Sequence, residues 1–428
     1  MDTIFALASA RGRAGVSVIR VSGPLAWDVA KALAGPGLRA RQATLRKLHD
    51  RSGMLLDQAL VLPFAEGASF TGEPVVEFQV HGSPAVVDAV ERAIAVYPGV
   101  RHAEPGEFTR RALTNNVLDL VQVEALADLI DADTEFQRRQ AITLLDGRLG
   151  EIVVGWRGLL VRAVSLMEAE IDFADEGLGA LGADALAALS EVHQGIEREL
   201  NGIRVRERVR SGFQVAIIGP VNSGKSTLLN ALAGREAAIT SSIAGTTRDV
   251  IEVHIDIDGH SVLMLDTAGI RDSEDEIERA GVSLALRRSA ESDLRVVLRA
   301  SPEDETVIEP GADDIVLVGK GDLYPEVPSR VSGTTGEGVD ALLEALSEKL
   351  GQLAKTDGVA VRRRHEDALR RADNALFLAK AGLSDGEYQP EIVAADIMTA
   401  IGALDMLIGK VDVEDLLDEI FASFCIGK

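Results

Sequence analysis

The stretch from Gly219 to Ser226 consists of residue types that bind phosphate. It reads Gly-Pro-Val-Asn-Ser-Gly-Lys-Ser and matches the pattern GxxxxGK(S/T). Gly219 and Gly224 allow the tight turn that points successive backbone N–H groups at one anion. Lys225 can reach the terminal phosphates of a nucleotide, and the Ser226 hydroxyl can ligate Mg²⁺. This stretch therefore predicts a phosphate-binding loop, with a chance match to a glycine-rich turn as the alternative.

The elements on either side of this loop are those that a phosphate-binding loop needs. The apolar run Val215–Ile218 predicts a buried strand of a parallel sheet, and Thr227–Leu232 predicts a helix. The N-terminus of that helix adds the positive end of its dipole to the site. The order strand, loop and helix favours a functional loop over a chance match.

Further along the chain, Asp266 ends the predicted strand Val262–Leu265 and begins the sequence Asp-Thr-Ala-Gly. Its carboxylate can hold Mg²⁺ through water, and the amide of Gly269 can meet a γ-phosphate. Thr247 lies in a loop from Ser241 to Asp249 that can close over Mg²⁺ as a switch. These residues predict a nucleoside triphosphate hydrolase.

Two later loops select the base. The sequence Lys320-Gly321-Asp322 follows Ile315–Val318, which predicts a buried parallel strand, and Ser332-Gly333-Thr334 comes next. The carboxylate of Asp322 can accept two hydrogen bonds from the edge of guanine, and adenine cannot donate them. A backbone amide of the second loop can approach guanine O6. The order and spacing of the whole set predict a GTPase.

Composition bounds the class of protein. The 428 residues are 46% hydrophobic and carry 44 basic and 68 acidic side chains, a net charge of −24, so RNA contact would need a local basic patch or a basic partner. The single cysteine, Cys425, excludes an internal disulfide and a Cys-based zinc site. The start lacks the pattern of a signal peptide, and no apolar run is long enough to span a bilayer. We expect a soluble cytoplasmic protein.

The chain divides by pattern into segments around an inserted domain. Residues 1–117 predict an α+β domain, with strands at Val16–Val21, Ala59–Leu62 and Val75–Val80 and a helix at Pro84–Ile94. Residues 211–354 predict an α/β P-loop domain, with a two-residue hairpin turn at Asp258-Gly259. Arg20 and Glu77 lie on predicted strands, where a solvated face is the alternative to a functional site.

Residues 118–210 and 355–428 have helical periodicity and predict the two parts of one α-helical bundle. A stripe from Leu145 to Ile171 predicts one long helix, and a second stripe runs from Leu186 to Ile203. Arg204, Arg206, Arg208 and Arg210 then predict an exposed basic exit toward the inserted domain. A solvated helix end is the favoured interpretation of Arg362–Arg364, over an RNA site.

Five short segments carry a resemblance to a known family. Gly12–Val16, Ser69–Glu73, Pro105–Thr109, Ile243–Asp249 and Cys425–Lys428 read GRAGV, SFTGE, PGEFT, IAGTTRD and CIGK. With these segments, which fall in all three predicted domains, the chain resembles the MnmE (TrmE) family of tRNA uridine-modification GTPases. The resemblance covers the whole chain.

The resemblance implies a homodimer formed through the N-terminal domains, which bind 5-formyl-tetrahydrofolate or a related folate as one-carbon donor. The folate-binding positions carried over are Arg20, Glu77, Val117 and Lys428. It also implies a heterotetramer with the flavoprotein MnmG. Together the two proteins would add an aminomethyl or carboxymethylaminomethyl group to C5 of the wobble uridine of certain tRNAs.

The resemblance further implies a GTPase activated by K⁺. Asn222, Ser241, Ile243 and Thr246 would ligate K⁺, and Ser226 and Thr247 would ligate Mg²⁺. Glu278 would position the attacking water through a second water, and the catalytic set is Glu278, Lys225 and Thr247. The full set of GTP-binding residues is Asn222, Ser223, Gly224, Lys225, Ser226, Thr227, Ser241, Ser242, Ile243, Ala244, Gly245, Thr246, Thr247, Asp266, Thr267, Ala268, Gly269, Gly319, Lys320, Gly321, Asp322, Ser332, Gly333 and Thr334.

The chain departs from the family pattern at three places. Gly319 replaces the usual Asn of the guanine motif, and Val117 replaces a Lys of the folate stretch. Ser301–Asp314 is a short acidic connection with two prolines where a crossover helix is expected. Loss of the Asn hydrogen bond is expected to weaken the binding of both GTP and ATP, while Asp322 keeps the preference for GTP. Gly319→Asn is therefore expected to restore the hydrogen bond and strengthen GTP binding.

Two other functions fit parts of the sequence. One is a regulatory or ribosome-assembly GTPase that binds RNA without modifying it, although such proteins usually carry a basic RNA-binding module. The other is a folate-dependent transferase with a degenerate nucleotide domain, which Gly319 favours. Lys225, Ser226, Thr247 and Asp266 argue against that second alternative.

Overall fold

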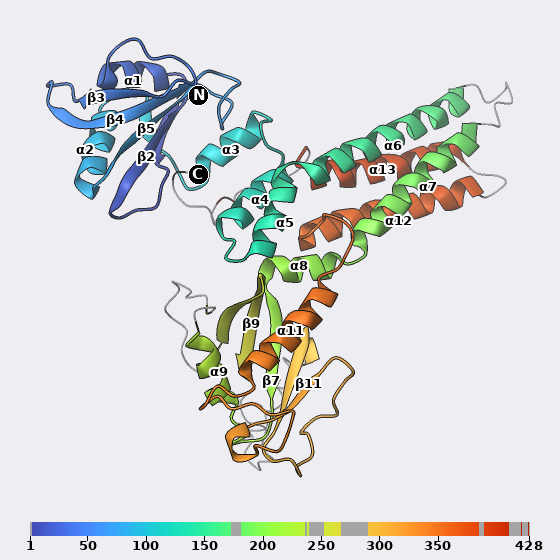
Figure 1. The fold of residues 1–428 in the computed structure, drawn as a ribbon. Coiled ribbons are helices and arrows are strands. Elements are labelled where there is room, and N and C mark those ends of the chain that lie inside the picture. The colour runs from blue at the N-terminus through green and yellow to red at the C-terminus, as the bar shows by residue number, and fades with distance from the viewer. Residues whose placement is uncertain are drawn as a thin grey trace, which may run out of the picture. The chain divides into compact units, whose positions relative to one another are not determined.

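The computed structural model of the chain describes residues 2–172, 181–235, 238, 252–266, 290–384, 389–410, 421 and 427. It forms two compact units, Met1–Ala127 with Asp405–Lys428, and Asp128–Leu404. Each unit is taken by itself below, with the element labels of Figure 1.

The first unit contains a six-stranded sheet in the order β3-β4-β5-β2-β1-β6. All neighbouring strands are antiparallel except β1 and β6, which are parallel. The strands are β1 (Thr3–Leu7), β2 (Ala14–Ser22), β3 (Thr44–His49), β4 (Leu55–Phe64), β5 (Val75–Gly82) and β6 (Val100–His102). The helices that follow in this part of the chain are α1 (Ala26–Ala34), α2 (Pro84–Ala95), α3 (Glu107–Thr114) and α4 (Leu120–Ile130).

Alternation along the strands gives this sheet two packed faces. Ile19, Val21 and Phe78 are buried in one cluster with the apolar sides of α1 and α2. Ile4 is buried on the other side with Phe108 of α3. The period-2 pattern of β2 and β5 thus places Arg20 and Glu77 on the face opposite α1 and α2.

The second unit contains a five-stranded sheet in the order β11-β10-β7-β9-β8, parallel except for the pair β8 and β9. Its strands are β7 (Phe213–Ile218), β8 (Glu252–Ile257), β9 (His260–Asp266), β10 (Leu294–Arg299) and β11 (Ile315–Val318). Helices α9 (Lys225–Ala233) and α11 (Val339–Leu353) pack with the strands in one buried cluster. The fold is the predicted α/β class, and its parallel strands end together at one edge, where α/β proteins bind ligands.

The rest of this unit is helical, as predicted. Its elements are α5 (Glu135–Leu145), α6 (Arg148–Asp172), α7 (Leu181–Leu200), α8 (Ile203–Ser211), α12 (Arg363–Ser384) and α13 (Pro390–Leu407). Figure 1 shows α6, α7 and α12 as long helices, and α7 packs against both of the others. Leu160 of α6, Val192 of α7 and Leu376 of α12 are fully buried. Among the described residues, no helix is long and apolar enough to cross a membrane.

The predicted strands and helices are found within the described residues. The hairpin turn is confirmed by the left-handed backbone of Asp258 (φ 50°) and Gly259 (φ 88°). One prediction is wrong in its bounds, because the long helix does not begin at Leu145. That residue ends α5, and Gly147 (φ 88°) separates α5 from α6, because glycine adopts the left-handed conformation without strain.

Of two expectations about β11 and the connection that precedes it, one is wrong and one is confirmed. Ile315, Val316 and Leu317 were expected to be fully buried, but they are only half-buried, and β11 lies at the edge of the sheet. The reason is the connection after β10, which contains no helix between Arg299 and Ile315 and leaves that face of β11 thinly covered. The prediction that a crossover helix is missing here is therefore confirmed.

A candidate nucleotide-binding site

The predicted phosphate loop joins β7 to α9. Gly224 precedes the first helical residue and has a left-handed backbone (φ 97°), as has Asn222 (φ 64°). The loop therefore turns back on itself before the N-terminus of α9, with the helix dipole behind it. Lys225 is buried, and its Nζ donates hydrogen bonds to the carbonyl oxygens of Gly219 (2.8 Å) and Pro220 (2.9 Å). The charged group is thus held inside the loop.

A hydroxyl and a carboxylate meet beside Lys225. Ser226 Oγ donates to Asp266 Oδ2 at 3.0 Å, because β9 pairs with β7 and ends on Asp266 next to the loop. Burial raises the pKa of Asp266, opposed by this hydrogen bond and by the charge of Lys225. Burial lowers the pKa of Lys225, opposed by the charge of Asp266.

These donor groups suit a divalent cation. Asp266 Oδ1 is buried without a hydrogen-bond partner in the described part of the chain. Oxygen ligands from one hydroxyl and one carboxylate are those that Mg²⁺ takes beside a nucleotide phosphate. A cation would therefore satisfy the unpaired oxygen and lower the cost of burying its charge. Ser226 and Asp266 fit the predicted Mg²⁺ site.

The two loops predicted to select the base lie against the P-loop and the start of α9. Gly321 N donates to Val331 O at 3.0 Å, which joins the first loop to the start of the second. Asp322 lies in the short helix η2 (Gly321–Leu323) and is exposed. Ser332 is buried. The carboxylate of Asp322 is thus available to a ligand, as its predicted role requires.

Gly319 stands directly against the P-loop. A Cβ atom built at Gly319 would overlap the carbonyl oxygen of Ser223, at less than the 3.0 Å that real Cβ atoms keep. The Gly319 N–H donates to Arg299 O at 2.9 Å, which fixes this residue at the end of the sheet. An Asn side chain has no space at this position in the structure, which argues against the expectation that Gly319→Asn would strengthen GTP binding.

Several predicted site residues lie outside the described residues. They are Ser241, Ser242, Ile243, Ala244, Gly245, Thr246 and Thr247 of the switch loop, Thr267, Ala268 and Gly269 after β9, Glu278, and Lys428. Their roles in binding K⁺, Mg²⁺, GTP and folate stay predictions.

In the first unit, Arg20 and Glu77 form an ion pair across β2 and β5. Nε and Nη2 of Arg20 both lie 3.0 Å from Glu77 Oε1, and each side chain is 18% exposed. The guanidinium lies 5.2 Å from the ring centre of Phe70 and 5.6 Å from that of Phe108. A fully solvated strand face therefore does not describe this pair. Val117 is exposed.

The aromatic members of this cluster were not predicted from the sequence. Phe70 and Phe108 lie in the segments Ser69–Glu73 and Pro105–Thr109 that carry the family resemblance. An aromatic residue in each of two such segments was the available signal. Its meaning depended on the fold, which brings both rings to one guanidinium.

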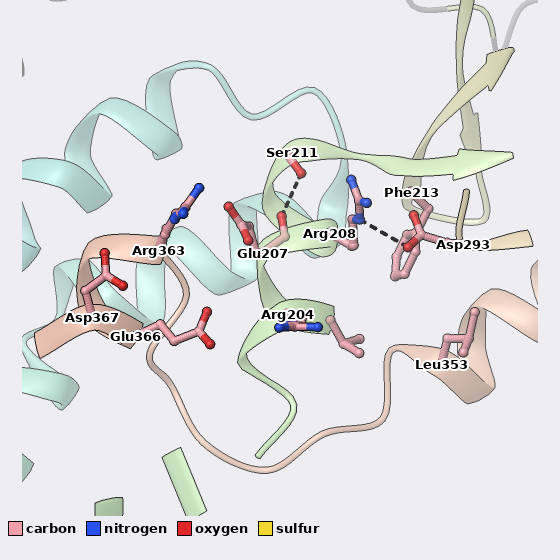
Figure 2. Close-up of a pocket in the computed structure, with 11 residues that line it drawn as sticks. Arg204, Glu207, Arg208, Ser211, Phe213, Asp293, Leu353, Arg363, Glu366 and Asp367 are labelled. Atoms are coloured by element: carbon pink, nitrogen blue, oxygen red, sulfur yellow. Dashed lines mark hydrogen bonds and ion pairs between the residues drawn. The ribbon is translucent and has the colours of Figure 1, made fainter. Parts of the chain in front are cut away.

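A pocket in the second unit is lined by none of the P-loop residues. The pocket has a volume of about 560 Å³. Figure 2 shows residues that line it, from α8, the start of α12 and the end of α11. Its lining mixes both signs of charge, and one ion pair joins Arg208 Nε to Asp293 Oδ1 at 3.1 Å. The charged lining residues are Arg204, Arg208, Arg363, Glu207, Asp293, Glu366 and Asp367. Because the charges nearly cancel, the pocket favours no single class of ligand, and we place the chemistry at the P-loop.

Comparison with known proteins decides the family. Residues 3–117 match the model of the GTP-binding protein TrmE N-terminus, and residues 120–425 match that of the MnmE helical domain. The chain belongs to the MnmE family. Proteins named tRNA modification GTPase MnmE from Ruegeria pomeroyi and Roseobacter denitrificans are each 52% identical over 429 residues, covering 100% of both chains. One from Cereibacter sphaeroides is 50% identical over 431 residues with the same coverage.

Membership of the MnmE family confirms the predicted resemblance, the fold class and the enzyme class, a GTP hydrolase. Among solved structures, the G domain of the T. maritima FeoB iron transporter is 19% identical, covering 33% of this chain and 99% of that one with a TM-score of 0.25.

Proposed function

We propose that this chain hydrolyses GTP to drive modification of C5 of the wobble uridine in certain tRNAs. The observation that carries the proposal is the convergence of Lys225, Ser226 and Asp266 at the N-terminus of α9. The tRNA substrate follows from the relatives, whose name is tRNA modification GTPase MnmE and which match this chain end to end.

The residues of the proposed site have distinct tasks in hydrolysis. The P-loop amides and Lys225 would bind the β- and γ-phosphates, and Ser226 and Asp266 would hold Mg²⁺, together with Thr247, which is carried over from the resemblance. Held by these residues, Mg²⁺ would supply positive charge to the phosphate oxygens. Asp322 orients guanine, so the γ-phosphate is placed in one position along the loop. Glu278, carried over from the resemblance, would orient the attacking water.

Potassium activation is part of the proposal. Asn222 lies in the P-loop with a left-handed backbone and an exposed side chain, so its neutral amide oxygen is available beside the phosphates. With Ser241, Ile243 and Thr246 it would hold K⁺. A cation there supplies positive charge against the transition state, as an arginine finger does in other GTPases.

The first unit is proposed to bind a folate. The Arg20 guanidinium pairs with Glu77 and lies over the rings of Phe70 and Phe108. A carboxylate, a guanidinium and aromatic faces together suit a flat heterocycle with amino and oxo groups. Lys428 and the position of Val117 would complete the site. The proposal includes a homodimer through these N-terminal domains and a heterotetramer with the flavoprotein MnmG. A cytoplasmic location follows from the tRNA substrate and stays a prediction.

The test is mass analysis of wobble uridines in cells that lack this protein. We expect the modified nucleoside to disappear, to return with the unmutated chain, and not to return with Lys225→Ala. Lys349→Ala is the matched control, because Lys349 lies on α11 and pairs with Asp313 (3.6 Å). Unchanged modification in the deleted cells would reject the proposal. A ribosome-assembly defect in those cells, with the tRNA modification unchanged, would favour the regulatory GTPase.

A further inference from the structure

The P-loop touches the guanine motif through main-chain atoms. A Cβ atom at Gly319 would overlap the Ser223 carbonyl oxygen and lie 3.0 Å from the Ser223 carbonyl carbon. Ser223 is fully buried, and its N–H donates to Pro220 O at 3.2 Å, a hydrogen bond that closes the turn of the loop just before this carbonyl. The backbone of the P-loop therefore occupies the space in which any side chain at residue 319 would begin.

Space, and not backbone conformation, makes glycine necessary here. Gly319 is absent from the residues with positive φ, so its backbone conformation is open to any amino acid. Its N–H is bonded to Arg299 O (2.9 Å), and Val318 before it pairs with β10. Gly319 therefore cannot withdraw from the contact without breaking a backbone hydrogen bond.

A second contact of the same kind lies one loop away. A Cβ at Gly333 would lie 2.5 Å from the carbonyl carbon and oxygen of Thr227 and 2.6 Å from Leu228 N. Those atoms belong to the first turn of α9, whose N-terminus faces the phosphates. Both loops predicted to select guanine thus pack on the phosphate-binding element without an intervening side chain.

We propose that Gly319 and Gly333 are positioning residues, which set the P-loop and the first turn of α9 relative to the base-binding loops by main-chain contact. In this chain the contact at residue 319 takes the place of the Asn side chain. Because a nucleotide must reach both the P-loop and the base loops, a shift of one against the other lowers the affinity for every purine nucleotide. The choice of base remains with Asp322.

The experiment is a titration of GTP, GDP and ATP against five variants of the full chain. Gly319→Ala and Gly319→Asn should both bind GTP at least tenfold more weakly than the unmutated protein, with an unchanged ratio of GTP to ATP affinity. The two losses should be similar, because the overlap arises at Cβ and not beyond it. Asp322→Asn should instead abolish the preference for GTP, so that the ratio of GTP to ATP affinity falls.

Gly351→Ala is the matched control, since Gly351 lies in α11 with nothing within 4 Å of a built Cβ, and it should bind as the unmutated chain does. GTP binding by Gly319→Asn that equals or exceeds that of the unmutated protein would overturn the proposal. Circular dichroism and melting separate folding from binding, because a merely structural glycine loses stability while the folded fraction binds normally. If the Gly319 variants do not fold, Gly333→Ala decides, and unchanged affinity there rejects the proposal.

Discussion

Arg206 is a single side chain that joins the two connections between the helical bundle and the nucleotide domain. It lies on α8, is 5% exposed, and donates to the carbonyl oxygens of Ala360 (2.7 Å) and Asn201 (3.0 Å). It also donates to the carbonyl oxygens of Asp357 and Glu199. Ala360 and Asp357 belong to the segment between α11 and α12, so α8 and that segment are held together by one guanidinium.

The cost of removing this group can be worked from its surroundings. Glu199 is 6% exposed, with Oε2 3.8 Å from Arg206, and it accepts hydrogen bonds from Val359 N (2.7 Å) and Ala360 N (2.9 Å). Arg206→Met keeps the aliphatic stem but leaves this carboxylate and several carbonyls without their cation, which costs about 3–5 kcal/mol. Burial lowers the pKa of Arg206, because desolvation offsets part of the favourable interaction of the guanidinium with its partners. We therefore expect about 3 kcal/mol, at the low end of that range.

Urea unfolding followed by tryptophan fluorescence measures this loss. The chain has two tryptophans, so a Trp27→Phe background leaves Trp156, which packs against Gly195 between α6 and α7 and reports on the bundle. Arg204→Met is the matched control on the same helix, since Arg204 is exposed and has no hydrogen bond or ion pair within the described residues, and it should change stability by less than about 0.5 kcal/mol.

A double variant separates the buried charge from lost packing. Glu199→Gln removes the charge left behind, so its combination with Arg206→Met should be less destabilised than the sum of the two single variants by about 1 kcal/mol or more. Additive effects, or an Arg206→Met protein as stable as the Arg204→Met control, would refute this account of the contact.

Three other outcomes are expected. Burial against Phe136 and Phe213 lowers the pKa of His260 below 6.5. Its contribution to stability is therefore present above pH 6.5 and is lost as pH falls through the lowered pKa, by at most about 1.4 kcal/mol per pH unit. The melting temperature should fall less between pH 7.5 and 5.5 for His260→Phe than for the unmutated chain, and an equal fall in both would contradict this. GTP hydrolysis should be about tenfold or more faster in K⁺ than in Na⁺, and Asn222→Ala should abolish the difference; equal rates in both salts for the unmutated chain would reject the K⁺ site. Val117→Lys should tighten folate binding by about 1 kcal/mol, and calorimetry that shows weaker or unchanged binding would count against the folate site.

Local patterns predicted most of the elements because each depends on neighbouring residues. The alternation of Val75–Val80, the turn at Asp258-Gly259 and the P-loop pattern are of this kind, and all are found in the structure. The helix from Leu145 was too long because an apolar stripe can continue across a break in the backbone, and Gly147 provides that break. A period shows which face is apolar but not where the helix ends.

The contacts that join distant segments were out of reach of the sequence. Arg206 was expected to be exposed like its neighbours in the run of alternating arginines, but it is buried, because the segment 357–360 closes over it. The sequence predicted only that Gly319 removes a hydrogen bond, whereas the structure shows a backbone contact between Gly319 and Ser223. In both cases the deciding partner lies more than ninety residues away or across the sheet, and no spacing rule specifies it.

The uncovered edge at β11 has a consequence for how the nucleotide domain opens. Ile315, Val316 and Leu317 are half-buried, and β11 pairs with β10 on one side. On the other side, within the described part of the chain, its backbone is bridged at Val318 alone, through hydrogen bonds with Ser329 and Val331. Segments with few buried apolar contacts open with the lowest free energy, so amide hydrogen exchange should be fastest here among the strands of this sheet. Because Gly319–Asp322 follow β11 without a break, each such opening also displaces the residues that select the base. GTP, which binds only the closed arrangement, should therefore slow exchange in a strand that it never touches.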